Sequence, residues 1–135
     1  MKDLQLLALA KQAREQAYAP YSGVTVGAAL ETLAGKVYLG CNIENAAYGP
    51  TNCAERTAFF KAVSEGERQF RAIAVVGGKD GAPEGFFPPC GVCRQVMREF
   101  CAGDFLIYLQ GPDGTVKTMT LAELLPQSFG PENVR

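Results

Sequence analysis

Residues 52–60 read NCAERTAFF and residues 88–96 read PPCGVCRQV, and these two stretches decide the interpretation of the chain. In each of them turn-forming residues give way to a helical pattern at a cysteine, so each is expected to form the first turn of a helix. The positive end of a helix dipole stabilises a thiolate and lowers the pKa of a thiol. Cys53, Cys90 and Cys93 are therefore expected to ionise readily. Two helices that point their first turns at one spot would bring these three sulfurs together.

The residues around these two helices alternate between helical and strand patterns. The expected elements are helix 3–18, strands 24–30 and 36–41, helix 52–65, strand 70–76, helix 90–100, strands 105–110 and 115–120, and helix 121–125. We expect Asp3 to cap the first helix, Gly66 to end the second, and Gly77 to close the strand that follows. This order predicts an α/β fold with three layers, α/β/α, around a five-stranded mixed sheet, in one domain over residues 1–135.

The composition excludes several classes of function. A net charge of -1 over 135 residues provides no basic surface for nucleic acid or for an anionic membrane. No apolar run approaches the ~20 residues of a membrane span, and the N-terminal pattern is that of an amphipathic helix, not of a signal peptide. The chain has no histidine, which excludes Ser-His-Asp, Cys-His and HExxH chemistry. Cysteines without a secretion signal are expected to be reduced thiols in a cytoplasmic protein.

The cysteines at positions 90 and 93 form a CxxC motif with more than one interpretation. Alone, the motif fits a redox dithiol or half of a closed structural zinc site. Cys53 would add a third sulfur, and three protein ligands leave the fourth position to water, as in a catalytic zinc site. Cys101 lies about two helical turns beyond the motif and Cys41 ends a strand, so both are expected to be small buried core residues.

Glu55 also has two interpretations. Asn52 and Glu55 have the spacing of a capping box, in which the carboxylate reaches back to the amide of the cap residue. Beside an open zinc site, the same carboxylate can take a proton from water and deliver it elsewhere. Because Cys53 stands only two residues away, the second interpretation is favoured.

Further motifs, together with these, resemble one protein family over nearly the whole chain. CNIENAAYG (41–49), NCAERTA (52–58) and PCGVCRQV (89–96) resemble the small, homotetrameric class of cytidine deaminases, whose zinc motif admits three cysteines. The resemblance implies a cytidine-deaminase-like fold and one zinc ion per chain. It implies the hydrolytic deamination of free cytidine and 2'-deoxycytidine to uridine and 2'-deoxyuridine, with release of ammonia, in pyrimidine salvage. It further implies a homotetramer whose sites are completed by neighbouring subunits.

The resemblance assigns the chemistry to the two helix starts. Cys53, Cys90 and Cys93 match the residues that hold zinc in the family, and Glu55 matches the proton shuttle. Three thiolates leave the zinc site with a net negative charge, which weakens the metal as a Lewis acid. Arg56 resembles the family's residue that donates hydrogen bonds to the zinc thiolates, and it would offset part of this charge.

The resemblance assigns substrate binding to residues elsewhere in the chain. Asn42 and Glu44 match the family's ribose-binding pair, since an amide and a carboxylate offer the acceptors and the donor that sugar hydroxyls need. Ala54 would lie against the base, Phe129 would stack on the pyrimidine of a neighbouring subunit, and Tyr48 would cross that interface. The alternatives are an Asx turn at Asn42, a solvated Glu44 and a plug of the chain's own core at Phe129.

Three features depart from the family pattern or stay open. Many relatives carry Phe where this chain has Val24, so one wall of the base pocket is altered. The loop over residues 79–89 contains Phe86 and Phe87, which either line an entrance or pack elsewhere. Arg94 either assists at the zinc thiolates or is a surface charge of its helix.

Other functions stay open beside this one. An aminohydrolase acting on a modified nucleoside or an aminopyrimidine antibiotic is an alternative because of Val24. A nucleic-acid-editing deaminase is disfavoured, because binding of a single strand needs a basic groove with stacking aromatics. Outside these enzyme classes, the chain could be a zinc-stabilised assembly module or a thiol redox protein.

Overall fold

The described chain, residues 1–79 and 84–135 of a computed structural model, contains the strands and helices in the predicted order. The elements are α1 (Asp3–Arg14), β1 (Val24–Thr32), β2 (Val37–Cys41), α2 (Ala54–Ser64), β3 (Phe70–Lys79), α3 (Gly91–Phe100), β4 (Leu106–Gln110), β5 (Val116–Thr120) and α4 (Leu121–Leu124). Two short 3₁₀ helices, Pro112–Gly114 and Pro131–Asn133, complete the set.

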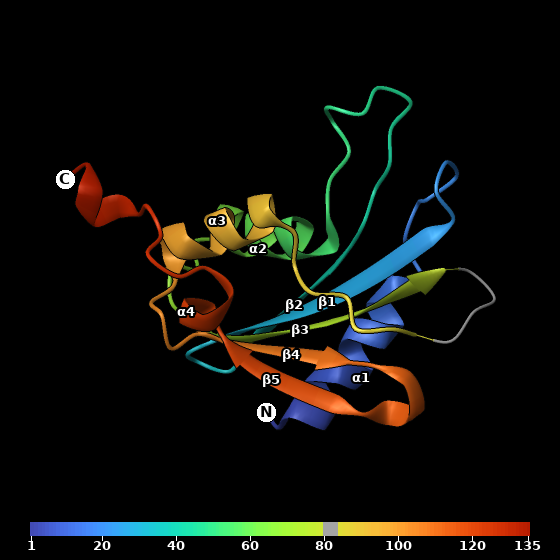
Figure 1. Ribbon diagram of the computed structural model, residues 1–135, viewed down its shortest axis with the longest axis horizontal. Helices are drawn as coiled ribbons and strands as arrows, with labels where there is room; N and C mark the ends of the chain where they lie inside the picture. The colour runs from blue at the N-terminus through green and yellow to red at the C-terminus, as the bar shows by residue number, and fades with distance from the viewer. Residues whose placement is uncertain (80–83) are drawn as a thin grey trace.

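The strands form one mixed sheet in the order β2-β1-β3-β4-β5 (Figure 1). Only β3 and β4, among the described strands, pair in parallel, with Ala72 opposite Leu106. A parallel pair needs a crossover connection, and α3 provides it between these two strands. The predicted five-stranded mixed sheet is confirmed.

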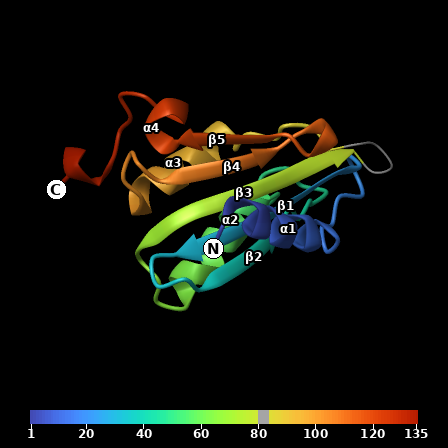
Figure 2. The ribbon, with the colours of Figure 1, turned by 90° about the horizontal axis from the view of Figure 1, so that it is seen from below.

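Helices cover both faces of the sheet. α1 packs on one face through Leu6, Leu7 and Ala10, which are almost completely buried. α2 and α3 cover the opposite face, where Phe59 and Met97 are fully buried. Figures 1 and 2 show α1 separated by the sheet from α2 and α3, so the three-layer α/β/α arrangement is confirmed.

Two glycines allow these helices to approach the sheet more closely than a methyl group permits. A Cβ at Gly27 in β1 would overlap the backbone of α1 at Ala10. A Cβ at Gly40 in β2 would overlap the carbonyl oxygen of Ala54 and lie 2.6 Å from the amide nitrogen of Ala58. The second contact fixes the height of the first turn of α2 above the sheet, and Cys53 immediately precedes that turn.

We expect Gly40→Ala to lower the free energy of unfolding by about 1–3 kcal/mol, because the new methyl group meets helix backbone that must move away. Urea denaturation followed by circular dichroism measures the change. Gly49→Ala is the matched control, since a Cβ at Gly49 has no neighbour within 4 Å. Equal losses of stability in the two variants would contradict the close packing of β2 on α2.

Element boundaries differ from the predictions where tertiary contacts decide them. α1 begins after Lys2, so Asp3 lies in its first turn and does not cap it. The helix ends at Arg14 and does not reach Tyr18, whose amide donates to the carbonyl of Asn42 at 3.0 Å. β3 continues through Gly77 to Lys79, because both of its glycines pair with β1. Gly66 ends α2 with φ +97°, as predicted.

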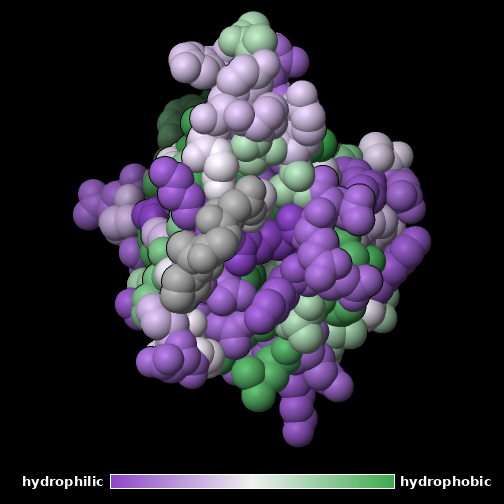
Figure 3. All heavy atoms as spheres, turned by 90° about the vertical axis from the view of Figure 1, so that its right-hand side faces the viewer, coloured by the Kyte–Doolittle hydropathy of each residue, from purple (hydrophilic) through white to green (hydrophobic). Residues whose placement is uncertain are grey.

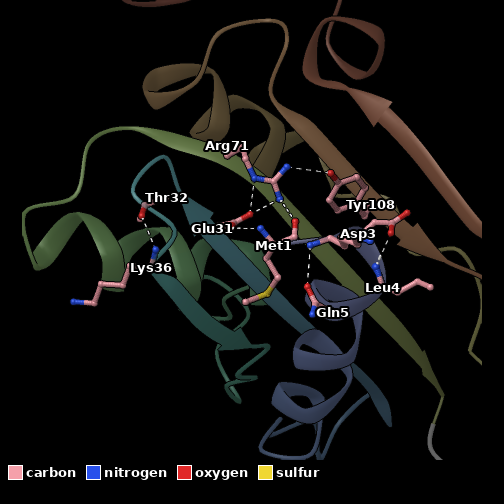
Figure 4. Close-up of polar contacts among 10 residues, drawn as sticks. Met1, Asp3, Leu4, Gln5, Glu31, Thr32, Lys36, Arg71 and Tyr108 are labelled. Atoms are coloured by element: carbon pink, nitrogen blue, oxygen red, sulfur yellow. Dashed lines mark hydrogen bonds and ion pairs between the residues drawn. The ribbon is translucent and has the colours of Figure 1, made fainter.

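An ion-pair network around the buried Glu31 ties the N-terminus to the sheet (Figure 4). The Glu31 side chain is only 3% exposed, and its carboxylate binds the guanidinium of Arg71 and, at 2.9 Å, the amino group of Met1. Arg71 also donates to the hydroxyl of Tyr108 at 3.3 Å. Burial opposes the charge of Glu31, but the hydrogen bonds from the amino group and from Arg71 lower its pKa below the usual value. The network holds the start of α1 against β1 and β3.

Figure 3 shows mainly hydrophilic side chains at the end where β1 begins and β3 ends. Among the helices of the described residues, none is long and apolar enough to cross a membrane.

Candidate active site

α2 and α3 begin side by side, and their first turns bring three thiols together. Cys53 is the residue that precedes α2, Cys90 precedes α3, and Cys93 lies in the first turn of α3. The Sγ atoms of Cys53 and Cys90 are 3.7 Å apart, and those of Cys90 and Cys93 are 3.6 Å apart. All three Sγ atoms lie within 4.8 Å of one another. The helix-start arrangement inferred from the sequence is the one that the structure contains.

The spacing and the chemistry of this cluster fit a zinc ion. Zn–S bonds of about 2.3 Å at tetrahedral angles place the sulfurs ~3.8 Å apart, close to the separations found here. Cys41 ends β2 and Cys101 follows α3, and neither belongs to the cluster. Within the described residues the cluster therefore offers three sulfur ligands, and a zinc ion bound by them would have a fourth position for water.

Arg56 provides a positive charge for the sulfur cluster. Its Nη2 donates to the Sγ of Cys53 at 3.3 Å. Hydrogen bonds from Cys93 and from Arg56 lower the pKa of the Cys53 thiol to about 5, although burial opposes this. Burial also opposes the charge of Arg56, but its hydrogen bonds to Cys53 and Cys93 raise its pKa above the usual value. The buried Nε of Arg56 has no hydrogen-bond partner among the described residues, which is typical of a site that holds a further polar group.

Glu55 lies in the first turn of α2, and it is not a capping residue. Cys53 occupies the cap position, and Asn52 instead donates from its Nδ2 to the hydroxyl of Thr57 at 3.2 Å. The side chain of Glu55 is 5% exposed, and within residues 1–79 and 84–135 it forms no ion pair. Burial, with a smaller contribution from Cys53, raises its pKa to about 7. The capping interpretation is wrong, and Glu55 is a buried carboxyl that can exchange a proton near neutral pH.

A cavity of about 260 Å³ joins Glu55 and two of the thiols, Cys53 and Cys90, to the predicted sugar-binding residues. The residues that line it are Val26, Asn42, Glu44, Thr51, Asn52, Cys53, Ala54, Glu55, Phe87, Pro88 and Cys90. Asn42, Glu44 and Ala54 therefore share one cavity with the metal-binding candidates. Val26 lines it, whereas Val24, two residues earlier in β1, is not among the lining residues.

Asn42 and Glu44 are held in fixed positions by the segment before β1 and by β1 itself. Asn42 accepts a hydrogen bond from the amide of Val26 and donates one to the carbonyl of Val24, each at 2.8 Å. The carboxylate of Glu44 accepts from the amide of Ser22 at 3.1 Å and from its hydroxyl. The alternative of an Asx turn is therefore wrong, and the Glu44 carboxylate, although accessible to solvent, is held by its hydrogen bonds to Ser22. The side chains are oriented before any ligand binds.

The two aromatic residues expected at a neighbouring subunit lie outside this cavity. The Phe129 side chain is 61% exposed, and its carbonyl accepts a hydrogen bond from the Nε2 of Gln95 in α3 at 2.9 Å. It does not fill the chain's own core. Tyr48 is 85% exposed and lies beside a second, smaller depression of about 180 Å³ that Glu44 and Thr51 also line. Within this chain both rings are free to contact another molecule.

The structure also decides the features that the sequence left open. Arg94 donates to the carbonyls of Pro89 and Leu124, each at 2.7 Å, so among the described residues it ties α3 to its neighbours. Of the long loop, residues 80–83 lie outside the described residues. Phe87 lines the cavity, whereas Phe86 packs over Gly111. Sequence reasoning did not assign Phe87 to the site, because a pair of phenylalanines carries no signal of which ring faces inward.

A mixed sheet whose covering helices begin at a cluster of three thiols, beside a cavity that also holds a buried carboxyl, defines a class of enzyme, the zinc-dependent deaminases that act on nucleobases. The family model described as "Cytidine and deoxycytidylate deaminase zinc-binding region" matches residues 1–109. The chain belongs to this family, and it is therefore a zinc-binding hydrolase.

Relatives in sequence and in structure agree with this assignment. A protein of Sporosarcina psychrophila named cytidine deaminase is 54% identical over 96% of this chain and 93% of its own length. A protein of the same name from Halalkalibacterium halodurans is 53% identical over 96% of this chain and 95% of its own. The crystal structure of cytidine deaminase from Burkholderia pseudomallei superposes with a TM-score of 0.88 at 50% identity, over 96% of this chain and all of the other. These likenesses confirm the fold as cytidine-deaminase-like.

Proposed function

We propose that this enzyme hydrolyses cytidine and 2'-deoxycytidine to uridine and 2'-deoxyuridine with release of ammonia, as part of pyrimidine salvage. The observation that carries the proposal is a cavity that two thiols of the sulfur cluster share with Glu55 and with the pair Asn42 and Glu44. A metal centre, a proton carrier and a sugar-binding pair are what the deamination of a nucleoside requires. The relatives named cytidine deaminases support the choice of base.

Cys53, Cys90 and Cys93 would hold one zinc ion per chain. When bound, zinc supplies a Lewis acid with an open position that makes water a nucleophile near neutral pH. Arg56 stabilises the sulfur ligands as thiolates through its hydrogen bond to Cys53 and offsets part of their negative charge. The N-termini of α2 and α3 act in the same direction.

Glu55 would carry the protons of the reaction. Its carboxylate takes one proton from the attacking water and gives it to N3 of the pyrimidine, and a second transfer protonates the amino group that leaves C4. One water adds and one ammonia departs. A general acid–base group must both bind and release protons at the working pH, and burial gives Glu55 a pKa of about 7 for this role.

The remaining residues of the cavity would position the nucleoside. Asn42 and Glu44 would bind the ribose hydroxyls. Hydrogen bonds to β1 and to Ser22 already fix both side chains, so little ordering is needed when the sugar binds. Ala54 is fully buried at the start of α2 and leaves room for the base. Val24 would influence the base from the end of this wall, since it lies two residues before the cavity-lining Val26, on the same face of β1.

We further propose a homotetramer in the cytoplasm, with residues 1–135 forming one catalytic domain. What supports an assembly is the exposure of Phe129 and Tyr48, two aromatic side chains that the chain's own core does not use. Phe129 would stack on the pyrimidine bound by a neighbouring subunit, and Tyr48 would lie at the same interface. The same sheet contributes residues to the hydrophobic cluster on each of its faces, which supports a single domain.

The direct test is the purified enzyme with cytidine and, separately, with 2'-deoxycytidine. We expect one ammonia to be released for each nucleoside consumed, together with the ultraviolet change that accompanies conversion of cytosine to uracil. Adenosine is the control substrate, since a site for a single pyrimidine ring has no room for a purine. A protein that binds zinc and leaves both cytosine nucleosides unchanged would refute the proposed function.

A further inference from the structure

We propose that Phe87 is a specificity-determining residue, which limits the cavity to pyrimidines that carry no bulky group at C5. The inference rests on the proposed function and names the part of the base that Phe87 meets. Phe87 is the aromatic residue of the cavity lining, and the sequence did not assign it to the site. Its position follows from contacts on both sides of the short segment that leads into α3.

The ring of Phe87 packs directly on the sheet. A Cβ added at Gly77 of β3 would lie 2.9 Å from Cγ of Phe87, and 3.0 Å from Cγ2 of Val26. A glycine at this position therefore makes the space in which the ring rests. The ring and Val26 together form a continuous apolar wall on one side of the cavity.

The segment that carries Phe87 is anchored before and after the ring, so the wall cannot easily withdraw. Before the ring, the amide of Gly85 donates to the carbonyl of Gly77 at 3.2 Å, and the carboxylate of Glu84 pairs with Lys11 of α1 at 3.2 Å. Phe86 rests on Gly111 on the side away from the cavity, with the Nζ of Lys117 4.5 Å from its ring centre. After the ring, the chain enters the thiol cluster at Cys90.

The chemistry of the cavity walls orients the base. The N3–C4 edge must face Glu55 and the thiols, and N1 must face Asn42 and Glu44 because it carries the sugar. Two edges remain, the C2 carbonyl and the C5–C6 carbons. The carbonyl needs polar neighbours, whereas the two CH groups suit an apolar wall. The C5–C6 edge is thus directed at Phe87 and Val26.

A substituent at C5 would then meet a ring that has no space behind it. The ring of Phe87 rests on Gly77 so closely that even a Cβ there would lie 2.9 Å from its Cγ, so a methyl group on the base can be accommodated only by strain. Removing the ring opens this side of the cavity. One methyl or methylene group in a hydrophobic pocket commonly changes kcat/KM by about 10- to 200-fold.

We expect Phe87→Ala to raise the ratio of kcat/KM for 5-methylcytidine to kcat/KM for cytidine by about 10-fold or more. We expect the KM for cytidine itself to rise, because an apolar contact with the base is lost. Zinc content, measured on each preparation, is expected to be equal to that of the parent. If Phe87→Ala does not fold, Phe87→Leu retains apolar volume and is expected to shift the ratio in the same direction by a smaller factor.

Phe86→Ala is the matched control, because it removes the neighbouring ring, which faces away from the cavity. We expect this variant to keep the parent's ratio. An unchanged ratio in a Phe87 variant that binds zinc and deaminates cytidine would overturn the inference and leave the proposed function intact. An equal shift in both variants would also overturn it, since the effect would then come from movement of the segment. A parent enzyme that leaves cytidine unchanged would refute the proposed function, and the inference with it.

Discussion

Glu55→Gln is expected to bind zinc like the parent enzyme and to lose at least about 10²- to 10⁴-fold in kcat with cytidine. Glutamine has the size of glutamate and fits the same buried position in the first turn of α2, but it cannot accept a proton from water. The loss should appear in kcat more than in KM, because the sugar-binding contacts of Asn42 and Glu44 are unchanged. Steady-state kinetics with cytidine, alongside zinc analysis of the same samples, measures both quantities.

Glu99→Gln is the matched control for this substitution. Glu99 is an exposed residue of α3, so the same change of charge occurs outside the cavity, and parent activity is expected. A Glu55→Gln enzyme that keeps more than about a tenth of the parent kcat would show that another group moves the protons, since a general acid–base group contributes at least ~10²-fold. Loss of zinc in this variant would instead assign Glu55 a role in holding the metal.

The same substitution is expected to leave the free energy of unfolding equal or higher. Burial of Glu55 without an ion pair costs stability, which is shown by the rise of its pKa to about 7. Glutamine removes the charge and keeps the packing. Active sites commonly keep such destabilising groups because the chemistry needs them. Urea denaturation of the two proteins, each saturated with zinc, measures the difference.

Local patterns were sufficient to predict the order of the elements. Alternation in residues 24–30 and the helical spacing that follows Cys53 and Cys90 are properties of short segments, and each survives folding. Gly66 shows the same for a turn, because a left-handed residue after a helix is a local requirement. Gly77 was misread for the opposite reason. The missing side chain at Gly77 leaves space for the ring of Phe87, ten residues later in the chain. No local sequence pattern indicates that contact.

Some residues of the candidate site could likewise be predicted from local motifs, whereas others depend on contacts between distant segments. Cys53, Glu55 and Cys90 could be recognised because each chemistry requires a particular residue type at a particular spacing. Asn42 and Glu44 needed the family resemblance, since an isolated amide and carboxylate are common in loops. The hydrogen bonds of Glu44 to Ser22 could not be predicted, because they join segments 22 residues apart. Their consequence is functional, since they orient a side chain proposed to bind substrate.

The protonation of the sulfur cluster determines how zinc binding depends on pH. The pKa of the Cys53 thiol is lowered to about 5, whereas the hydrogen bond to Cys53, together with burial, raises the pKa of Cys93 above the usual range. Cys93 therefore keeps its proton where zinc requires a thiolate. Zinc binding must release the remaining protons, so affinity increases with pH until the thiols are ionised. Arg56 is the cation that the chain itself contributes.

Removal of zinc is therefore expected to abolish turnover and to lower the melting temperature, and readdition of zinc should restore both. A ligand that binds only the folded chain stabilises it by RT ln(1 + [L]/Kd), which is about 2.7 kcal/mol at 100 times Kd. Dialysis against a chelator, followed by calorimetry and assay with cytidine, measures the two effects. A chelated protein that keeps both its activity and its melting temperature would contradict the metal centre.

Cys90→Ser tests the same centre without a chelator. Cys90 is exposed, so serine there is expected to leave the packing of α3 intact while removing one of three sulfur ligands. Loss of an outer partner of a metal ligand costs about 10- to 100-fold in affinity, and loss of a ligand should cost more. Cys41→Ser is the matched control, because Cys41 ends β2 outside the cluster and should keep one zinc per chain and full turnover. Equal zinc content in the two variants would mean that the metal is held elsewhere, since only Cys90 among these two residues lies within reach of Cys53 and Cys93.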